Sequence, residues 1–167
     1  MQSELDWRQD EITLYGKQVL IPRLQAWYGD EDSFYQYSGL SLTPLPWTES
    51  LWQLKKRVEQ TCDTSFNSML ANCYRDEKDS VAWHSDDEPE LGRQPIIASL
   101  SFGAERVFQL KHKMTGERFK LPLQSGSLLI MAGNTQQYWL HAVPKQQRHS
   151  GARINLTFRK IIAKKFY

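Results

Sequence analysis

The fold follows from one alternating stretch, Arg153-Ile154-Asn155-Leu156-Thr157-Phe158-Arg159, in which polar and apolar residues succeed one another without a break. In a β-strand, successive side chains point to opposite faces, so this alternation predicts a strand with one polar and one apolar face. Arg153 and Arg159 share the polar face. On an inward face these arginines need anions, and a dicarboxylate such as 2-oxoglutarate supplies two carboxylates suited to the planar guanidinium group.

Other short segments rich in β-forming residues lie on both sides of a single helical pattern. The predicted strands are residues 11–15, 19–21, 34–38, 66–74, 95–102, 107–113 and 126–131. The helical pattern begins after Thr48, a suitable N-cap, and places Leu51, Leu54, Val58 and Cys62 on one face, with the run 55–57 largely on the solvated face. Many short strands and few helices predict a mainly β protein, a double-sheet jelly roll with one or two supporting helices.

Composition favours an ordinary globular protein. The chain has 167 residues, of which 40% are hydrophobic and 24% charged, as expected for one soluble domain. No apolar run approaches the roughly 20 residues of a membrane span, and the first residues lack the regions of a secretory leader. We therefore expect a cytoplasmic protein without membrane contact. Cys62 and Cys73 form no disulfide framework and no metal-binding spacing, which indicates reduced, structural cysteines.

Charge is unevenly distributed along the chain. Residues 1–90 hold 17 acidic and 8 basic side chains, whereas residues 91–167 hold 2 acidic and 13 basic ones. Such asymmetry is a hint of polyanion binding. The basic residues of the predicted hairpin, Lys111, His112, Lys113, Arg118 and Lys120, fit either of two roles. They discourage edge-to-edge aggregation of strands, or they face nucleic-acid phosphates.

A second pattern indicates a metal site. His84 and Asp86 are two residues apart, and His141 follows 55 residues after Asp86. This is the sequence form of a 2-His-1-carboxylate facial triad, which leaves three positions of an octahedral ion open and suits non-haem Fe(II) enzymes. Taken alone, His84 is more simply read as an ordinary core or surface histidine.

At this point the sequence resembles the AlkB-type Fe(II)/2-oxoglutarate dioxygenases, and most closely their subgroup that repairs alkylated double-stranded DNA. The matching runs cover roughly residues 28 to 162 in the family's order. They are residues 35–40, 72–74, 84–88, 97–104, 121–129 and 153–160. The resemblance implies a double-stranded β-helix fold in a single dioxygenase domain over residues 1–167. Residues 1–60 would form a nucleotide-recognition and supporting segment, and residues 61–167 the catalytic jelly-roll core.

The resemblance also implies roles for individual residues. The triad His84, Asp86 and His141 would bind Fe(II) and carry the catalysis, with 2-oxoglutarate and O₂ as co-substrates. Arg153 would bind the distal carboxylate of 2-oxoglutarate and Arg159 would lie near the metal-bound carboxylate. The other residues expected around 2-oxoglutarate are Asn72, Tyr74, Asn155 and Thr157.

Three residues are expected near the substrate. Tyr37 matches the family's base-stacking aromatic, with Ser38 beside it; the simpler interpretation of this segment is a half-buried strand. Glu88 would accept a hydrogen bond from an exocyclic amine and favour a cationic alkylated base, although residues 87–90 also read as a solvated acidic loop. In the loop 145–151, two glutamines stand where the family has a basic run, which argues against strong duplex binding there.

We therefore expect a DNA oxidative demethylase that removes N-alkyl groups of the 1-methyladenine and 3-methylcytosine type by direct-reversal repair. The expected partner is alkylated DNA or RNA, bound by a monomer in the cytoplasm, at a nucleoid or in a nucleus. Three other readings stay open. They are a 2-oxoglutarate oxygenase acting on RNA, a protein or a small molecule; a non-catalytic nucleic-acid-binding module; and a manganese or zinc cupin.

Overall fold

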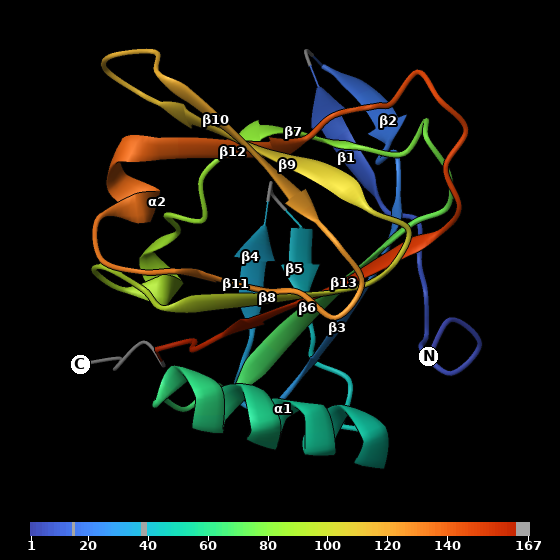
Figure 1. Cartoon of the computed structure of the whole chain (residues 1–167). Helices are drawn as coiled ribbons and strands as arrows, with labels where there is room; N and C mark the ends of the chain where they lie inside the picture. The colour runs from blue at the N-terminus through green and yellow to red at the C-terminus, as the bar shows by residue number, and fades with distance from the viewer. Residues whose placement is uncertain (15, 38–39, 163–167) are drawn as a thin grey trace.

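Two antiparallel sheets face each other and form the body of the protein (Figure 1). The computed structural model describes residues 1–14, 16–37 and 40–162, of which residues 14, 35–37 and 40–42 are described by their backbone alone. The major sheet has the order β11 (Leu128–Met131), β8 (Ile97–Gly103), β13 (Arg153–Arg159), β6 (Ser68–Tyr74) and β3 (Leu24–Gly29). The minor sheet has the order β10 (Arg118–Leu123), β9 (Arg106–His112), β12 (Trp139–Val143) and β7 (Val81–His84). This arrangement confirms the predicted jelly roll.

Smaller elements complete the fold. Two short hairpins pair β1 (Glu11–Leu14) with β2 (Lys17–Leu20) and β4 (Tyr35–Tyr37) with β5 (Leu40–Leu42). The helices are α1 (Glu49–Cys62), the single turn α2 (Thr135–Tyr138) and the 3-10 turn η1 (Pro89–Leu91). Within the described residues, every helix is too short or too polar to cross a membrane.

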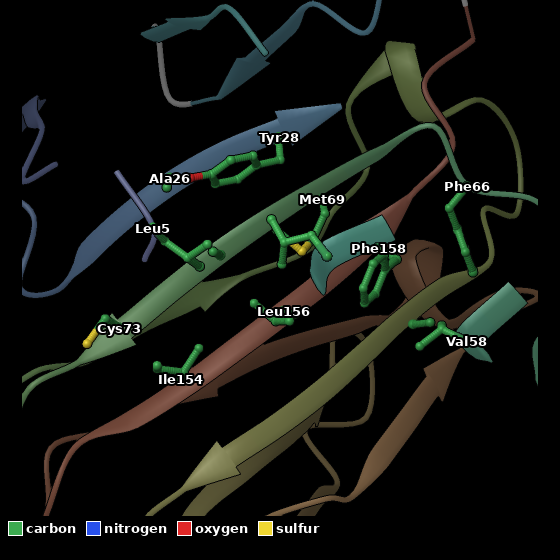
Figure 2. Packing of buried hydrophobic residues seen from close by; sticks show 13 residues of the cluster. Leu5, Ala26, Tyr28, Val58, Phe66, Met69, Cys73, Ile154, Leu156 and Phe158 are labelled. Atoms are coloured by element: carbon green, nitrogen blue, oxygen red, sulfur yellow. The ribbon is translucent and has the colours of Figure 1, made fainter. Parts of the chain in front are cut away.

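The alternation in β13 separates the fold into an outer core and a polar interior. Ile154, Leu156 and Phe158 are buried on one face of β13, and Figure 2 shows them in a row beside Met69 and Cys73 of β6. Helix α1 covers this face through Leu51 and Val58, and Figure 1 shows it below the major sheet, on the side away from the minor sheet. Because this apolar face supplies the packing of β13, the opposite face of the strand can hold polar side chains.

A second apolar cluster lies between the sheets. It joins Trp27 and Leu70 of the major sheet to Phe108 and Val143 of the minor sheet. The same inner space holds the polar side of β13, because Arg153, Asn155, Thr157 and Arg159 are all buried. The two sheets therefore enclose a space that is apolar in part and strongly polar in part.

Helix α1 begins as the sequence predicts but differs in one side chain. Thr48 accepts a hydrogen bond from Leu51 N–H at 3.3 Å, which confirms it as the N-cap. Lys55, expected with its neighbours on the solvated face, is instead buried. Its ammonium lies 2.7 Å from Glu59 Oε1 and above the Trp47 and Trp52 rings. An opposite charge and two aromatic faces compensate the lysine for its lost water.

Candidate metal centre

The predicted metal triad comes together at the inner face of the minor sheet. His84 ends β7 and lies directly opposite His141 of β12 in the sheet register, so their rings are 4.2 Å apart between centroids. Asp86 follows β7 by two residues, and its carboxylate oxygens lie 3.8 Å from His84 Nε2 and 3.9 Å from His141 Nε2. One ligand atom from each residue falls within 4.8 Å of the others. Three donors at such spacing can hold one metal ion.

The charges around the triad favour the forms that bind a metal. Burial raises the pKa of Asp86, but Arg159 and the two imidazoles outweigh it and lower the value to about 2. Burial lowers the pKa of His141 to about 4, with a further contribution from His84. At neutral pH the site therefore presents an ionised carboxylate and a neutral His141 imidazole, which are the protonation states of metal ligands.

The unsatisfied atoms of the triad fit a cation. His84 Nδ1 lies 2.8 Å from the carbonyl oxygen of Ala82, which leaves Nε2 to face Asp86. Oδ1 of Asp86 is buried and accepts no hydrogen bond from the described residues. A buried, ionised oxygen without a donor is costly, and a bound metal ion would remove that cost.

The two arginines of β13 occupy opposite ends of the same polar face. Arg159 donates to Asp86 Oδ2 at 3.0 Å, so it lies beside the metal ligands. Arg153 donates to Ser101 Oγ at 2.9 Å and stacks over the Tyr74 ring at 5.3 Å. Its Nε and Nη1 are buried and, among the described residues, have no hydrogen-bond partner of ordinary geometry. These two nitrogens can therefore still donate hydrogen bonds to a ligand such as a carboxylate.

All six residues expected around 2-oxoglutarate line the same cavity as the triad. They are Asn72, Tyr74, Arg153, Asn155, Thr157 and Arg159. Sheet register explains this, because Arg153 pairs with Tyr74 and Asn155 pairs with Asn72 across β13 and β6. Cross-strand partners project from the same face of a sheet, so one polar strand places polar neighbours beside it.

Asn155 and Thr157 form hydrogen bonds with neighbouring protein groups and with each other. Asn155 donates to Ser99 Oγ at 2.7 Å and to the carbonyl oxygen of Leu100 at 3.2 Å. It also accepts from the Thr157 hydroxyl at 2.9 Å. Asn155 and Thr157 therefore form the polar wall of the cavity, whereas Arg153 presents open donors.

The expected substrate residues are less well placed by the structure. Tyr37 ends β4, where only the backbone is described, and Ser38 lies outside the described residues. Glu88 is half-buried and precedes η1. Glu88 is not one of the described residues that line the cavity.

Sequence reasoning missed Arg23, a third arginine of the cavity wall. It precedes β3, is buried, and donates from Nε to Asn72 Oδ1 at 2.8 Å. The two residues are 49 positions apart in the chain. No local signal marks Arg23, since only the pairing of β3 with β6 brings it to the cavity.

A second missed group braces the cavity behind Tyr74. Arg106 is buried, stacks over the Tyr74 ring at 5.4 Å, and donates to the carbonyl oxygens of Asp76, Asp79 and Pro144. In the same loop, Asp79 accepts from Arg75 N–H and from two guanidinium nitrogens of Arg75 at 2.7–2.9 Å. Charged hydrogen bonds therefore fix the loop between β6 and β7. Strand β7 follows this loop and ends at His84, so the fixed loop helps to position that metal ligand.

The chain is similar in sequence to a known enzyme family and to several known proteins. The chain matches the family model described as 2OG-Fe(II) oxygenase superfamily over residues 1–159. It is similar to the human alpha-ketoglutarate-dependent dioxygenase alkB homolog 3, with 51% identity over 150 residues, covering 84% of this chain and 52% of that protein. It is also similar to the mouse DNA oxidative demethylase ALKBH2, with 42% identity over 163 residues, covering 93% of this chain and 68% of that protein.

The solved structure of OsALKBH1 aligns with a TM-score of 0.62 at 17% identity, over 84% of this chain and 78% of that chain. This match supports the jelly-roll fold independently of sequence. The chain spans about half the length of the alkB homolog 3 proteins that it matches.

The Asp79 network predicts a pH dependence of stability. Burial raises the pKa of Asp79, but the hydrogen bonds and charge of Arg75 outweigh it and hold the pKa below its ordinary value. A depressed folded-state pKa stabilises the fold above the unfolded-state pKa, and this stabilisation is lost as pH falls through the folded value. We expect Asp79→Asn to lower the free energy of unfolding at pH 7 by about 1–3 kcal/mol, with the difference shrinking below about pH 3.5.

Urea unfolding of both proteins between pH 3 and pH 7 measures this difference. Asp32→Asn, at an exposed turn position, is the matched control and should leave the pH profile unchanged. A constant difference between Asp79→Asn and the unsubstituted protein across this pH range would contradict the assignment.

The buried guanidinium nitrogens of Arg153 that remain available predict a strict need for arginine. Lysine keeps the charge but offers one compact ammonium in place of a planar group with several donors. We expect Arg153→Lys to weaken 2-oxoglutarate binding at least about tenfold, or about 1.4 kcal/mol. Calorimetric titration with Mn(II) in place of Fe(II) measures this without turnover. Arg148→Lys, in an exposed loop position, should bind as the unsubstituted protein does, and equal affinities for all three proteins would exclude Arg153 as the carboxylate ligand.

Proposed function

The chain belongs to the 2OG-Fe(II) oxygenase superfamily and, within it, to the AlkB family, and on this basis we propose that it oxidatively demethylates N-alkylated bases in DNA. The expected lesions are of the 1-methyladenine and 3-methylcytosine type. One observation carries the proposal: the triad lines the same cavity as Arg153, whose Nε and Nη1 have no hydrogen-bond partner of ordinary geometry among the described residues. The family implies Fe(II), 2-oxoglutarate and O₂, and a metal triad joined to a carboxylate-binding arginine suits that set of reactants.

His84, Asp86 and His141 would hold the iron, and Arg153 would hold the distal carboxylate of 2-oxoglutarate. When bound, iron and 2-oxoglutarate supply the oxidation: O₂ is consumed, 2-oxoglutarate becomes succinate and CO₂, and an N-methyl C–H becomes C–OH. The resulting N-hydroxymethyl group leaves as formaldehyde, and the base regains its N–H or lone pair without a cut in the strand.

The protein contributes positioning and the exclusion of water. Arg153 would fix the orientation of the co-substrate, because a guanidinium edge binds a carboxylate in one plane. Arg159 keeps Asp86 ionised and holds its carboxylate between the two histidines. Asp86, His141 and the two arginines are buried and His84 is half-buried, so the site is largely shielded from bulk solvent, which limits side reactions.

An aromatic rim beside the metal site supports a nucleic-acid substrate. We define the rim as His112, Phe119, Tyr138 and Trp139. Trp139 pairs with His112, and both His141 and Phe119 pair with Leu110, so three rim residues share the sheet face of the metal ligand His141. The rings contact one another, with Phe119 and Trp139 centroids 5.4 Å apart. Phe119 and Tyr138 are 47% and 40% exposed, which leaves ring surface open for bases.

Basic side chains also lie on the β9–β10 hairpin that carries His112 and Phe119. The register places Lys111, Arg118 and Lys120 on the opposite face of the minor sheet from the rim. Lys113 lies at the rim itself, because its backbone N–H donates to the Tyr138 carbonyl oxygen at 2.8 Å. Aromatic surface combined with positive charge is the usual means of holding unpaired nucleotides. The target base must leave its stack to reach a buried metal, and damaged pairs open most easily.

RNA is the second candidate substrate. The relatives named DNA oxidative demethylase favour DNA, whereas the aromatic rim suits any unpaired strand. The contacts that distinguish RNA from DNA involve the 2′-hydroxyl and leave no motif in the sequence. We therefore propose DNA as the main substrate and treat RNA as the alternative to be tested beside it.

Three broader proposals accompany this function. Residues 1–167 would act as one dioxygenase domain, with residues 61–167 as the catalytic core and residues 1–60 as the supporting and nucleotide-recognition segment; β3, from the latter, completes the major sheet. The protein would act as a monomer, because the triad and its arginines come from one chain. It would work where cellular DNA lies, in the cytoplasm, at a nucleoid or in a nucleus.

Mass spectrometry tests the proposed activity directly. A duplex and a single-stranded oligonucleotide, each with one 1-methyladenine, are incubated aerobically with protein, Fe(II), ascorbate and 2-oxoglutarate. We expect loss of the methyl mass only in the complete reaction, and none with His84→Ala because one of three metal ligands is gone. An unchanged oligonucleotide alongside continued succinate formation would redirect the search to RNA or protein substrates.

If the aromatic rim stacks on bases that flank the lesion, a rim variant should lose affinity for an oligonucleotide but not for a free nucleotide. We expect Phe119→Ala to raise the KM for a methylated oligonucleotide about 5- to 100-fold, the equivalent of one lost stacking contact. Turnover of the free nucleotide 1-methyl-dATP should stay unchanged, because it has no flanking bases. Met114→Ala, at an 83% exposed position of the same hairpin, is the control. Equal effects on the oligonucleotide and the nucleotide would place Phe119 outside the flanking-base site.

A further inference from the structure

A buried glutamine in the short turn α2 contacts the metal-binding loop. Gln136 is 2% exposed, although the flanking residues Asn134, Gln137 and Tyr138 are exposed. Its Oε1 accepts a hydrogen bond from the backbone N–H of Asp86 at 2.9 Å. The two residues are 50 positions apart in the chain. A polar side chain buried in an otherwise exposed turn indicates a specific task for this residue.

The chemistry of the neighbours fixes which way the Gln136 amide points. Asp86 N–H is a donor, so it requires the carbonyl end of the amide. The opposite end, Nε2, lies 3.6 Å from the Met131 sulfur, which is a weak acceptor. Both ends of the amide are therefore matched, and a reversed amide would place two donors against each other.

Asp86 depends on this contact because no strand holds it. Strand β7 ends at His84, and η1 begins at Pro89, so Asp86 lies in a connecting segment. Arg159 holds its carboxylate, and Gln136 holds its backbone. One contact holds the side chain and the other holds the backbone, and together they set where the carboxylate faces the histidines.

The backbone of Gln136 is also held by a hydrogen bond. Lys113 of the β9–β10 hairpin donates to the Gln136 carbonyl oxygen at 2.9 Å, and its ammonium lies 3.4 Å from Asp87. Five residues after Gln136 comes His141, so one short segment supplies one metal ligand and holds a second, Asp86. Movement of α2 would thus displace two of the three protein ligands at once.

We propose that Gln136 is a positioning residue that sets the Asp86 backbone for metal binding. Loss of its acceptor oxygen would leave Asp86 N–H buried without a partner and allow the carboxylate to turn away from the histidines. Residues that orient metal ligands in this way typically change metal affinity 10- to 100-fold when substituted. The inference rests on the metal site of the proposed function, but it makes no use of the substrate.

The test measures binding of Mn(II) alone to the full chain by calorimetry, without 2-oxoglutarate or nucleic acid. Gln136→Met keeps the length of the side chain and removes the acceptor, and we expect a 10- to 100-fold weaker affinity. Gln136→Glu keeps an acceptor oxygen at the same reach, and we expect it to retain most of the affinity. Gln137→Met, at the exposed neighbouring position, should bind as the unsubstituted protein does.

A stability control separates positioning from general weakening of the fold. Val58 of α1 packs into the outer core, away from the metal site, and Val58→Ala lowers stability without touching the triad. Melting temperatures of the metal-free variants show that each is folded at the titration temperature. The proposal is overturned if Gln136→Met binds Mn(II) normally, if Gln136→Glu is as weak as Gln136→Met, or if Val58→Ala weakens binding equally.

Failure of this proposal and failure of the demethylase proposal are distinguishable. Normal Mn(II) binding by Gln136→Met would reject the positioning role while leaving demethylation by the unsubstituted protein untouched. Conversely, an unsubstituted protein that binds Mn(II) but leaves methylated oligonucleotides unchanged would reject the substrate and keep the role of Gln136 open to the same titration. If Gln136→Met does not fold, Gln136→Asn shortens the side chain by one methylene, withdraws the acceptor from Asp86, and is expected to weaken Mn(II) binding to a similar degree.

Discussion

The structure depends on the burial of one carboxylate, Asp86. An ionised carboxylate removed from water is costly unless opposite charge and hydrogen-bond donors surround it. Arg159 supplies charge at 3.0 Å, two histidines lie within 4 Å, and Gln136 secures the backbone. Apart from His84, which lies two residues before Asp86 at the end of β7, these partners come from α2, β12 and β13 and follow Asp86 by 50 residues or more. Closing the two sheets on each other is what brings them to one carboxylate, so the fold and the metal site form together.

The two faces of strand β13 have different roles, one in stability and the other in the chemistry of the site. The apolar side of β13 packs against α1 and β6, whereas its polar side presents Arg153 and Arg159 to the cavity. Burying four polar residues in a row is unfavourable unless each has partners, and the neighbouring strands provide them through Ser99, Ser101 and Tyr74. The apolar packing on the outer face supplies stability that offsets the cost of this polar interior.

Local patterns in the sequence predicted most of the fold and much of the site, and long-range contacts account for the rest. The alternation of β13 and the cap at Thr48 are local, and each is confirmed. The triad is not local, because His141 follows Asp86 by 55 residues, but its residue types and spacing indicated it and the three side chains do come together. Arg23 and Gln136 carry no such signal, since their partners lie 49 and 50 residues away. Lys55 was placed wrongly because Glu59 and two tryptophans, rather than helical periodicity, decide its burial. The roles of Tyr37, Ser38 and Glu88 stay predictions.

The separation of the two faces of β13 has a consequence for how this protein can diversify. Substitutions on the inner face alter the charge and shape of the cavity, while the packing under α1 stays intact. A lineage can therefore explore new co-substrates or lesions by changing inward residues one at a time, with the outer core as a constant foundation. The same property makes the chain a suitable scaffold for engineering, because the side chains of the pocket can be redesigned without changing those of the outer core.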